Sequence, residues 1–260
     1  MARAAAMLAV LLAAVAAAGA ADQQKAKMFI LAGQSNMVGK GAVAELPADL
    51  KKTPANVRLY HAGRAEPLAA AASFGPEVAF AHELARAWPE RQIIIVKFAV
   101  GGTSLLDWAP DWTEQNARRT ETAKAGPLYA KLIEHVKAAA GGGAVEIAAV
   151  VWEQGGRDAK FPDVAAEYGK NLRKIVERLR KDLAAPDLPF IYGEVNTPPG
   201  RFPATEDVRK GQQQVAREVP RVKLVPTKGL RTLSDETHYD TQGQLELGKR
   251  FARAFLELGG

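Results

Sequence analysis

The sequence contains no cysteine among its 260 residues. Disulfide bonds, thiolate metal sites, cysteine nucleophiles and lipid attachment at cysteine are therefore excluded, and the fold must be held by its core alone. Basic residues are only in slight excess, with 35 lysines and arginines against 29 acidic residues and no dense basic run. Mixed charge of this kind is typical of a solvated surface, so we expect no nucleic-acid partner.

Long hydrophobic runs are missing after the first two dozen residues. Arg3 is followed by an apolar, alanine-rich stretch, Ala4–Ala18, and then by small residues that suit a cleavage site. This pattern predicts a signal peptide over residues 1–20, too short and too weakly hydrophobic for a stable span, with a retained N-terminal anchor as the lesser alternative. We therefore expect a secreted or periplasmic protein with no stable membrane insertion after cleavage.

Apolar, strand-like runs alternate with segments of helical spacing over the remaining ~240 residues, a length that suits one domain. This alternation predicts βαβ units and a parallel sheet covered on both faces, in a single α/β domain over residues 26–260. The expected strands are Met28–Ala32, Val57–Tyr60, Ile93–Val100, Val145–Trp152, Phe190–Val195 and Val222–Val225. The expected helices are Val78–Trp88, Pro127–Ala140, Val164–Leu183, Val208–Val219 and Gln242–Leu258.

A strand that ends at a serine is the first candidate for chemistry. The run Met28–Ala32 stops at Gly33-Gln34, and Ser35 follows at once. In open α/β sheets ligands bind beyond the carboxyl ends of the strands, which is where Ser35 would serve as a nucleophile. The same residues fit a plain turn into a helix with Ser35 or Asn36 as the N-cap, and the stretch alone favours that interpretation.

Two further strand ends carry groups suited to stabilise an oxyanion. The strand that starts at Ile93 leads into Gly101-Gly102, where backbone N–H groups can approach a ligand closely, although two glycines equally make a plain turn. The strand that starts at Val145 leads into Gln154, whose side-chain amide is able to donate to a developing oxyanion.

Asp235 and His238 precede the last expected helix. Three residues apart, the two side chains fall on one side of a helical turn, so the carboxylate is able to accept a hydrogen bond from the imidazole. Such a pair fixes the imidazole tautomer and supports the imidazolium during catalysis. Two alternatives stay open: Asp235 caps the final helix, or Asp235, Glu236 and His238 bind a metal.

Trp108 and Trp112 lie in a long irregular segment, Thr103–Ala125. Long loops shape binding sites, so the two indoles are a candidate stacking platform for a sugar ring. Loop tryptophans just as often pin a loop to the body of the protein, and both interpretations stay open.

Several blocks occur in order along most of the mature chain: Gly33-Gln34-Ser35-Asn36-Met37, Phe74-Gly75-Pro76-Glu77, Val100-Gly101-Gly102-Thr103-Ser104 with Trp108, Trp152-x-Gln154-Gly155, Asp235-x-x-His238 and Gly248-x-Arg250. Together they resemble the SGNH (GDSL-like) hydrolases, and within them the sialate O-acetylesterase-like carbohydrate esterases that include acetylxylan esterases. The resemblance implies a three-layer α/β/α sandwich with a mainly parallel five-stranded sheet in flavodoxin-like order.

The resemblance also implies an activity. The protein would be a secreted serine esterase that removes O-acetyl groups from carbohydrates and needs no metal or organic cofactor. Ser35 would be the nucleophile, His238 the general base and Asp235 its orienting carboxylate. The oxyanion hole would consist of the Ser35 N–H, the Gly102 N–H and the side-chain amide of Gln154.

One position departs from the family pattern, because this chain has Gly156 where the family usually has a glutamate. Loss of that carboxylate is expected to loosen the loop that holds Gln154 or to change substrate contacts. Two other function classes stay open: a carbohydrate-binding relative that has lost catalysis, and an esterase that acts on lipid or other acyl esters. The candidate substrate contacts are Asn36, Trp108, Trp112 and Glu153.

Overall fold

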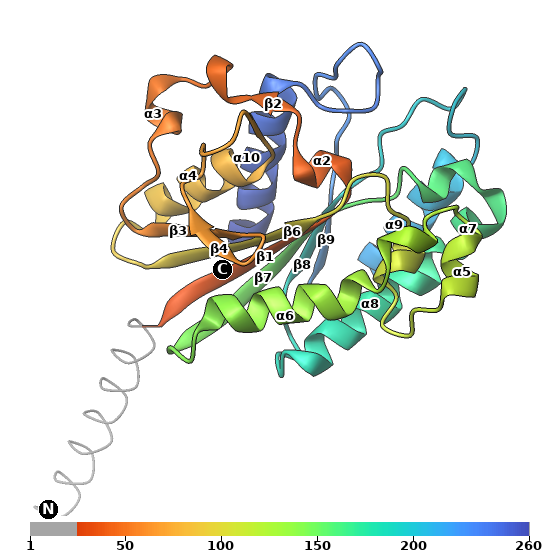
Figure 1. Ribbon diagram of the computed structural model, residues 1–260, viewed down its shortest axis with the longest axis horizontal. Coiled ribbons are helices and arrows are strands. Elements are labelled where there is room, and N and C mark those ends of the chain that lie inside the picture. The colour runs from red at the N-terminus through yellow and green to blue at the C-terminus, as the bar shows by residue number, and fades with distance from the viewer. Residues whose placement is uncertain (1–24, 260) are drawn as a thin grey trace, which may run out of the picture.

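The computed structural model describes residues 25–259, so the predicted signal peptide lies outside the described residues. Its main feature is a seven-stranded sheet with the order β4-β3-β6-β1-β7-β8-β9 (Figure 1). The strands are β1 (Ala26–Gly33), β3 (Val57–His61), β4 (Arg64–Glu66), β6 (Ile93–Ala99), β7 (Val145–Glu153), β8 (Phe190–Gly193) and β9 (Val222–Val225). A separate antiparallel pair consists of β2 (Gly41–Ala42) and β5 (Ser73–Phe74).

The pairing in the main sheet is parallel except between β3 and β4. Numbered among themselves, β6, β1, β7, β8 and β9 follow the order 2-1-3-4-5, which is the expected flavodoxin-like arrangement. The expected count of five strands is wrong, because β3 and β4 extend the sheet beyond β6. The strand β4 is polar and largely exposed, so no apolar run marks it in the sequence.

Helices cover both faces of the sheet, which confirms the expected three-layer architecture (Figure 1). The expected helix over residues 164–183 is two helices, because the chain breaks at Glu167. None of the helices within residues 25–259 is long and apolar enough to cross a membrane. The α-helices are α2 (Ser35–Val38), α3 (Ala48–Lys51), α4 (Glu77–Ala87), α5 (Glu114–Arg118), α6 (Leu128–Ala140), α7 (Pro162–Ala166), α8 (Tyr168–Asp182), α9 (Thr205–Glu218) and α10 (Thr241–Glu257), and the 3₁₀ segments are η1 (Val43–Glu45), η2 (Leu105–Trp108), η3 (Ala123–Ala125) and η4 (Asp158–Lys160).

The central strand β1 contributes to a core on each face of the sheet. Phe29 and Leu31 point into the core beneath α4 and α10. Met28 and Ile30 point into the core beneath α6, α8 and α9. All four side chains are fully buried, as expected for a central strand of a sheet covered on both faces.

The strand order changes direction at β1, which has β6 on one side and β7 on the other. Gly33, at the carboxyl end of β1, is paired with Ala99 of β6 and with Glu153 of β7. A Cβ on Gly33 would come within 2.2 Å of the Glu153 carbonyl oxygen, so only glycine lets the strands stay this close. In open α/β sheets the crevice at such a switch point is where ligands bind.

Candidate active site

Ser35 is the first residue of α2 and lies two residues past the end of β1. The turn between them is held by the N–H of Gln34, which donates to the Glu153 carbonyl oxygen at 2.8 Å. The N-cap of α2 is Gln34, so the interpretation of Ser35 or Asn36 as the cap is wrong. At the first helical position, the N–H of Ser35 has no intrahelical acceptor.

Ser35, His238 and Asp235 form a continuous hydrogen-bonded chain. The Nε2 atom of His238 lies 3.0 Å from Ser35 Oγ, and its Nδ1 atom lies 2.5 Å from Asp235 Oδ2. The other carboxylate oxygen of Asp235 accepts from the backbone N–H groups of Thr237 and His238, each at 2.9 Å. The carboxylate therefore closes the turn and orients the imidazole, which leaves Nε2 placed to take a proton from the serine.

Asp235 is held in its ionised form. Burial by itself would raise its pKa, but hydrogen bonds from the backbone and ring of His238 and from the Thr237 N–H outweigh burial and lower the pKa to about 2. A lowered carboxyl pKa stabilises the fold above the unfolded-state pKa, and this stabilisation is lost as the pH falls toward 2. Asp235 is therefore a carboxylate at neutral pH.

The segment that carries Asp235 and His238 is an irregular turn, not the helical turn that the spacing predicts. The chain reverses at Glu236, which has a φ of +54°. The helix α10 starts later and is capped by the side chain of Asp240, so the interpretation of Asp235 as its cap is wrong. Among residues 25–259, no group of three or more histidine, aspartate or glutamate side chains is placed to hold a metal ion.

Asn36 and Arg201 dock this turn onto the rest of the site. The amide of Asn36 donates to the Thr237 carbonyl oxygen at 3.0 Å and accepts from the Tyr239 N–H at 3.1 Å. Arg201, in the loop after β8, donates to Thr237 Oγ1 at 2.7 Å and to the Asp235 carbonyl oxygen. The Asn36 amide therefore couples α2 to this turn. Its expected contact with substrate stays a prediction.

Gly101 and Gly102 lie beside the serine. A Cβ on Gly101 would lie 3.9 Å from the Cβ of Ser35, and Gly102 has a φ of +74°. Within residues 25–259 the N–H of Gly102 has no hydrogen-bond acceptor. This N–H and that of Ser35 are therefore free to donate to a ligand at the end of β1.

Gln154 is not placed as the sequence predicts. Its buried Nε2 atom donates to Asp158 Oδ2 at 2.5 Å and to the Thr103 carbonyl oxygen at 3.1 Å, with Gln34 Oε1 at 3.3 Å. Its Oε1 atom accepts from the Tyr168 hydroxyl at 2.9 Å. An amide nitrogen carries two hydrogens, and both are used inside the protein, so the expected donation from Gln154 to an oxyanion is not available in this arrangement.

Asp158 is a site residue that the sequence analysis missed. It is fully buried and accepts from Ser104 Oγ at 2.8 Å and from the Leu105 N–H at 3.0 Å, in addition to Gln154. Burial raises its pKa to about 6, against the opposing effect of these hydrogen bonds. The signal in the sequence that could have identified Asp158 was its position, as an acidic residue four positions after Gln154.

Gly156 leaves room for Gln34. A Cβ at this position would lie 2.8 Å from Gln34 Nε2 and 3.3 Å from the Thr197 methyl group, so any side chain at position 156 would displace the Gln34 amide. Gln154 is nevertheless held on both sides of its own amide by Asp158 and Tyr168. The expected loosening of this loop is therefore not seen.

Trp108 belongs to the core. Its ring lies 5.0 Å from that of Trp152 and 5.6 Å from that of Phe98, and its Nε1 donates to Thr103 Oγ1 at 3.2 Å. It is 1% exposed, so the prediction that it stacks on a sugar is wrong, and the alternative, that it pins the loop, is correct. Trp112 is half-buried, and within residues 25–259 no hydrogen bond or ring contact links it to the triad.

Residues 25–257 match the family described as carbohydrate esterase, sialic acid-specific acetylesterase. The chain belongs to this family of carboxylic ester hydrolases. A probable carbohydrate esterase of Arabidopsis thaliana is 29% identical over 254 residues, which cover 88% of this chain and 90% of that protein. The X-ray structure of the same Arabidopsis protein matches with a TM-score of 0.75 at 26% identity, over 90% of this chain and 98% of that one.

Two more distant structures show the same fold. A carbohydrate acetylesterase from Xanthomonas citri matches with a TM-score of 0.69 at 19% identity, over 89% of this chain and 56% of that one. NanS matches with a TM-score of 0.68 at 17% identity, over 91% of this chain and 98% of that one. The expected SGNH hydrolase fold is thus confirmed, with two strands more than the expected five.

A buried ion pair supports the serine helix of this carbohydrate esterase. Lys97 Nζ lies 2.8 Å from Glu77 Oε2 and donates to the Val38 carbonyl oxygen, at the end of α2, at 2.9 Å. Glu77 Oε1 accepts from the Gly75 N–H at 2.9 Å. The end of α2 is thereby tied to both β6 and α4. The signal for Lys97 was a single lysine within an otherwise apolar strand, which the sequence analysis passed over.

Glu153, at the end of β7, is buried against β8. A Cβ on Gly193 would lie 1.9 Å from Glu153 Oε2, so glycine is required opposite this carboxyl group. Burial raises the pKa of Glu153 to about 8, and among the described residues Oε2 has no hydrogen-bond partner. The group is therefore protonated at neutral pH and hidden, and the expectation that it contacts substrate is wrong.

The substitution Glu153→Gln is expected to stabilise the esterase at alkaline pH. Between the ordinary carboxyl pKa of 4.5 and the folded-state pKa of about 8, the folded state keeps a proton that the unfolded state has lost. Stability therefore falls as the pH rises through this window. One pKa unit corresponds to about 1.4 kcal/mol. Since glutamine does not ionise, we expect the stability of the variant relative to the wild type to be about 2 kcal/mol greater at pH 8 than at pH 5. Urea unfolding at pH 5 and pH 8 measures this, and an equal effect of the substitution at both pH values would contradict it.

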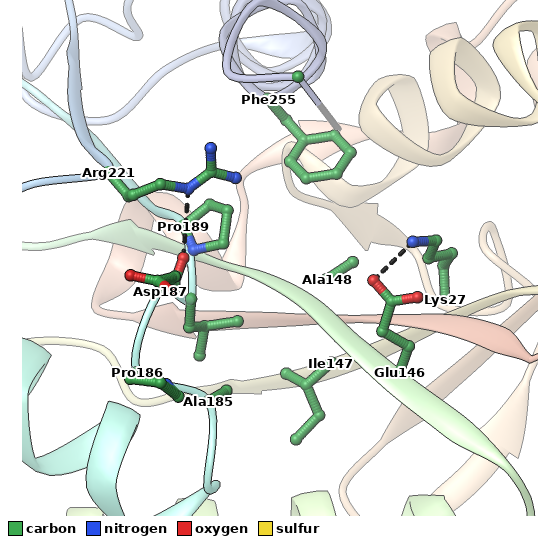
Figure 2. A pocket seen from close by; sticks show the side chains of 12 residues that line it. Lys27, Glu146, Ile147, Ala148, Ala185, Pro186, Asp187, Pro189, Arg221 and Phe255 are labelled. Atoms are coloured by element: carbon green, nitrogen blue, oxygen red, sulfur yellow. Dashed lines mark hydrogen bonds and ion pairs between the residues drawn. The ribbon is translucent and has the colours of Figure 1, made fainter. Parts of the chain in front are cut away.

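A separate cavity of about 300 Å³ lies at the opposite edge of the sheet (Figure 2). It is lined by the ion pair between Lys27 and Glu146 near the starts of β1 and β7, and by Arg221, which donates to the Asp187 carbonyl oxygen. Lys27 lies near the start of β1 and Ser35 lies just past its end, roughly 25 Å away along the strand direction. This cavity is therefore no part of the candidate active site.

Proposed function

We propose that this protein is a serine esterase that releases acetate from O-acetylated carbohydrates through an acyl-enzyme on Ser35. The observation that carries the proposal is the hydrogen-bonded chain from Ser35 through His238 to Asp235 at the carboxyl end of β1. It is supported by the unused N–H groups of Ser35 and Gly102 beside the serine oxygen. Membership in a carbohydrate esterase family supports the substrate class.

In the first half of the reaction, Ser35 Oγ attacks the acetyl carbonyl carbon while His238 Nε2 takes the serine proton. Asp235 keeps the imidazole in the required tautomer and stabilises the imidazolium. The oxygen of the tetrahedral intermediate accepts from the N–H groups of Ser35 and Gly102. The bond to the sugar oxygen then breaks, and His238 gives its proton to that oxygen, which leaves an acetyl group on Ser35.

In the second half, water attacks the acetyl-serine carbonyl, with His238 taking the proton from the water. The same two N–H groups hold the oxyanion, and collapse of the intermediate returns the proton to Ser35 Oγ and releases acetate. We also propose that residues 1–20 direct export, so that the enzyme meets its substrate in the periplasm or outside the cell. N-terminal sequencing of the mature protein would locate the cleavage.

Acetate release from acetylated xylan and from acetylated sialic acid, measured beside hydrolysis of octanoyl esters, tests the substrate class. We expect acetate from at least one carbohydrate and a lower kcat/KM for the longer acyl group, with Ser35→Ala protein as the blank. Hydrolysis of octanoyl esters without acetate release would support the lipid esterase alternative. A wild-type protein that binds acetylated polysaccharide and hydrolyses no ester would support the binding alternative.

A further inference from the structure

The glycine loop beside Ser35 has little packing of its own. Gly101 and Gly102 are both exposed, and a Cβ on Gly102 would meet nothing within 4 Å. Two adjacent glycines have wide conformational freedom, so the position of the Gly102 N–H depends on the residues that anchor the loop. On its N-terminal side the loop is anchored by the Val100 N–H, which donates to the Gly33 carbonyl oxygen at 3.0 Å. On its C-terminal side the anchors are the residues Thr103–Leu105.

All three of these following residues are held by Asp158 and Gln154. The Asp158 carboxylate accepts from Ser104 Oγ at 2.8 Å and from the Leu105 N–H, which lies 3.0 and 3.1 Å from its two oxygens. The Gln154 amide donates to the Thr103 carbonyl oxygen at 3.1 Å. None of these bonds faces solvent, because Asp158 is fully buried and Gln154 is 2% exposed.

Asp158 and Gln154 are also bonded to each other and to the helix layer. Gln154 Nε2 donates to Asp158 Oδ2 at 2.5 Å. The hydroxyl of Tyr168, a fully buried residue of α8, donates to Gln154 Oε1 at 2.9 Å and lies 3.1 Å from its backbone carbonyl oxygen. The two side chains thus connect the end of β7 and the start of α8 to the glycine loop.

We propose that Asp158 and Gln154 act as one positioning unit that holds the Gly101-Gly102 loop against Ser35. Gln154 then affects the oxyanion through the placement of the Gly102 N–H. This inference rests on the proposed esterase reaction. An ionised Asp158 suits the role, because its neighbours Ser104, Leu105 and Gln154 all offer donors and an ionised carboxylate only accepts.

A double-mutant cycle tests whether Gln154 and Asp158 act as one unit. We expect Gln154→Ala and Asp158→Asn each to lower kcat about 10–100-fold while KM stays within about threefold, because a misplaced donor affects the transition state more than substrate binding. The kcat of the double variant should be no more than about threefold below that of the less active single variant, because both changes break the same unit. Losses that multiply would show that Gln154 and Asp158 act independently and would overturn the proposal. The assays are run at pH 8, above the pKa of Asp158, which burial raises to about 6.

A milder variant and a matched control complete the design. Ser104→Ala removes one hydroxyl donor to Asp158 and should lower kcat severalfold with little change in KM, whereas an unchanged kcat would overturn the proposal. Asp163→Asn, an exposed aspartate of α7 paired with Arg119, should leave kcat unchanged. Acetate release by the wild type distinguishes the two claims: an inactive wild type contradicts the esterase itself, whereas multiplying losses in an active enzyme contradict only the positioning unit.

Discussion

Replacing Ser35 with alanine is expected to lower kcat for acetyl ester hydrolysis by about 10⁴-fold or more. The substitution removes the oxygen that lies 3.0 Å from His238 Nε2, and no other hydroxyl is bonded to that nitrogen in residues 25–259. Alanine favours helix, so α2 and the two backbone N–H donors are retained. The residual activity should come from those donors and from substrate binding. Hydrolysis of p-nitrophenyl acetate and acetate release from acetylated xylan both measure the effect.

The matched control is Ser73→Ala, the same substitution at an exposed position of β5. It should retain wild-type kcat and KM, since Ser73 makes no contact with the triad. A Ser35→Ala protein with more than a tenth of wild-type kcat would mean that another group attacks the ester. In that case the hydrogen-bonded chain through His238 would have a structural role only.

The second large effect concerns stability. Lys97→Met is expected to lower the free energy of unfolding by about 3–5 kcal/mol, because it leaves the Glu77 carboxylate buried without its partner. Both side chains are nearly buried, with 5% and 4% of their area exposed, and Lys97 also holds the Val38 carbonyl oxygen. Urea unfolding at pH 7 measures the loss. Since the same contact fixes the end of α2, esterase activity should fall as well.

Two variants show whether the unpaired charge is the cause. Lys97→Met combined with Glu77→Gln removes both charges and should be more stable than Lys97→Met alone. Lys27→Met makes the same substitution in the neighbouring strand, where the ion pair with Glu146 is partly exposed, and should change stability by less than about 1 kcal/mol. Equal destabilisation by Lys97→Met and Lys27→Met would contradict the assignment of the large effect to burial.

Much of the sheet could be predicted because buried parallel strands are continuous apolar runs. The apolar runs that start at Met28 and Val145 predicted strands, and these correspond to β1 and β7. The antiparallel strand β4 could not be found in this way, because it is short and its residues Arg64 and Ala65 are exposed. The break at Glu167 was also missed, since α7 and α8 keep a nearly continuous helical spacing of apolar residues.

The candidate active site could also be predicted only in part. Residue type and spacing were enough to bring Asp235 to His238, although the local structure is a turn and not a helix. The direction and burial of a side chain depend on tertiary structure, so they could not be predicted from the sequence. Trp108 points into the core, and the amide of Gln154 points toward Asp158. The role of Asp158 depends on a loop more than 50 residues away in the chain, which no local pattern reports.

The chemistry is tested most directly by the mass of the peptide that contains Ser35, recovered after acid quenching of the enzyme during turnover of p-nitrophenyl acetate. With an activated ester, acylation outpaces hydrolysis of the acyl-enzyme, so the acetylated form accumulates. We expect one added acetyl group on this peptide in the wild type and none in Ser35→Ala. An acetyl group on a different residue, or turnover with no covalent adduct, would contradict the assignment of Ser35 as the nucleophile.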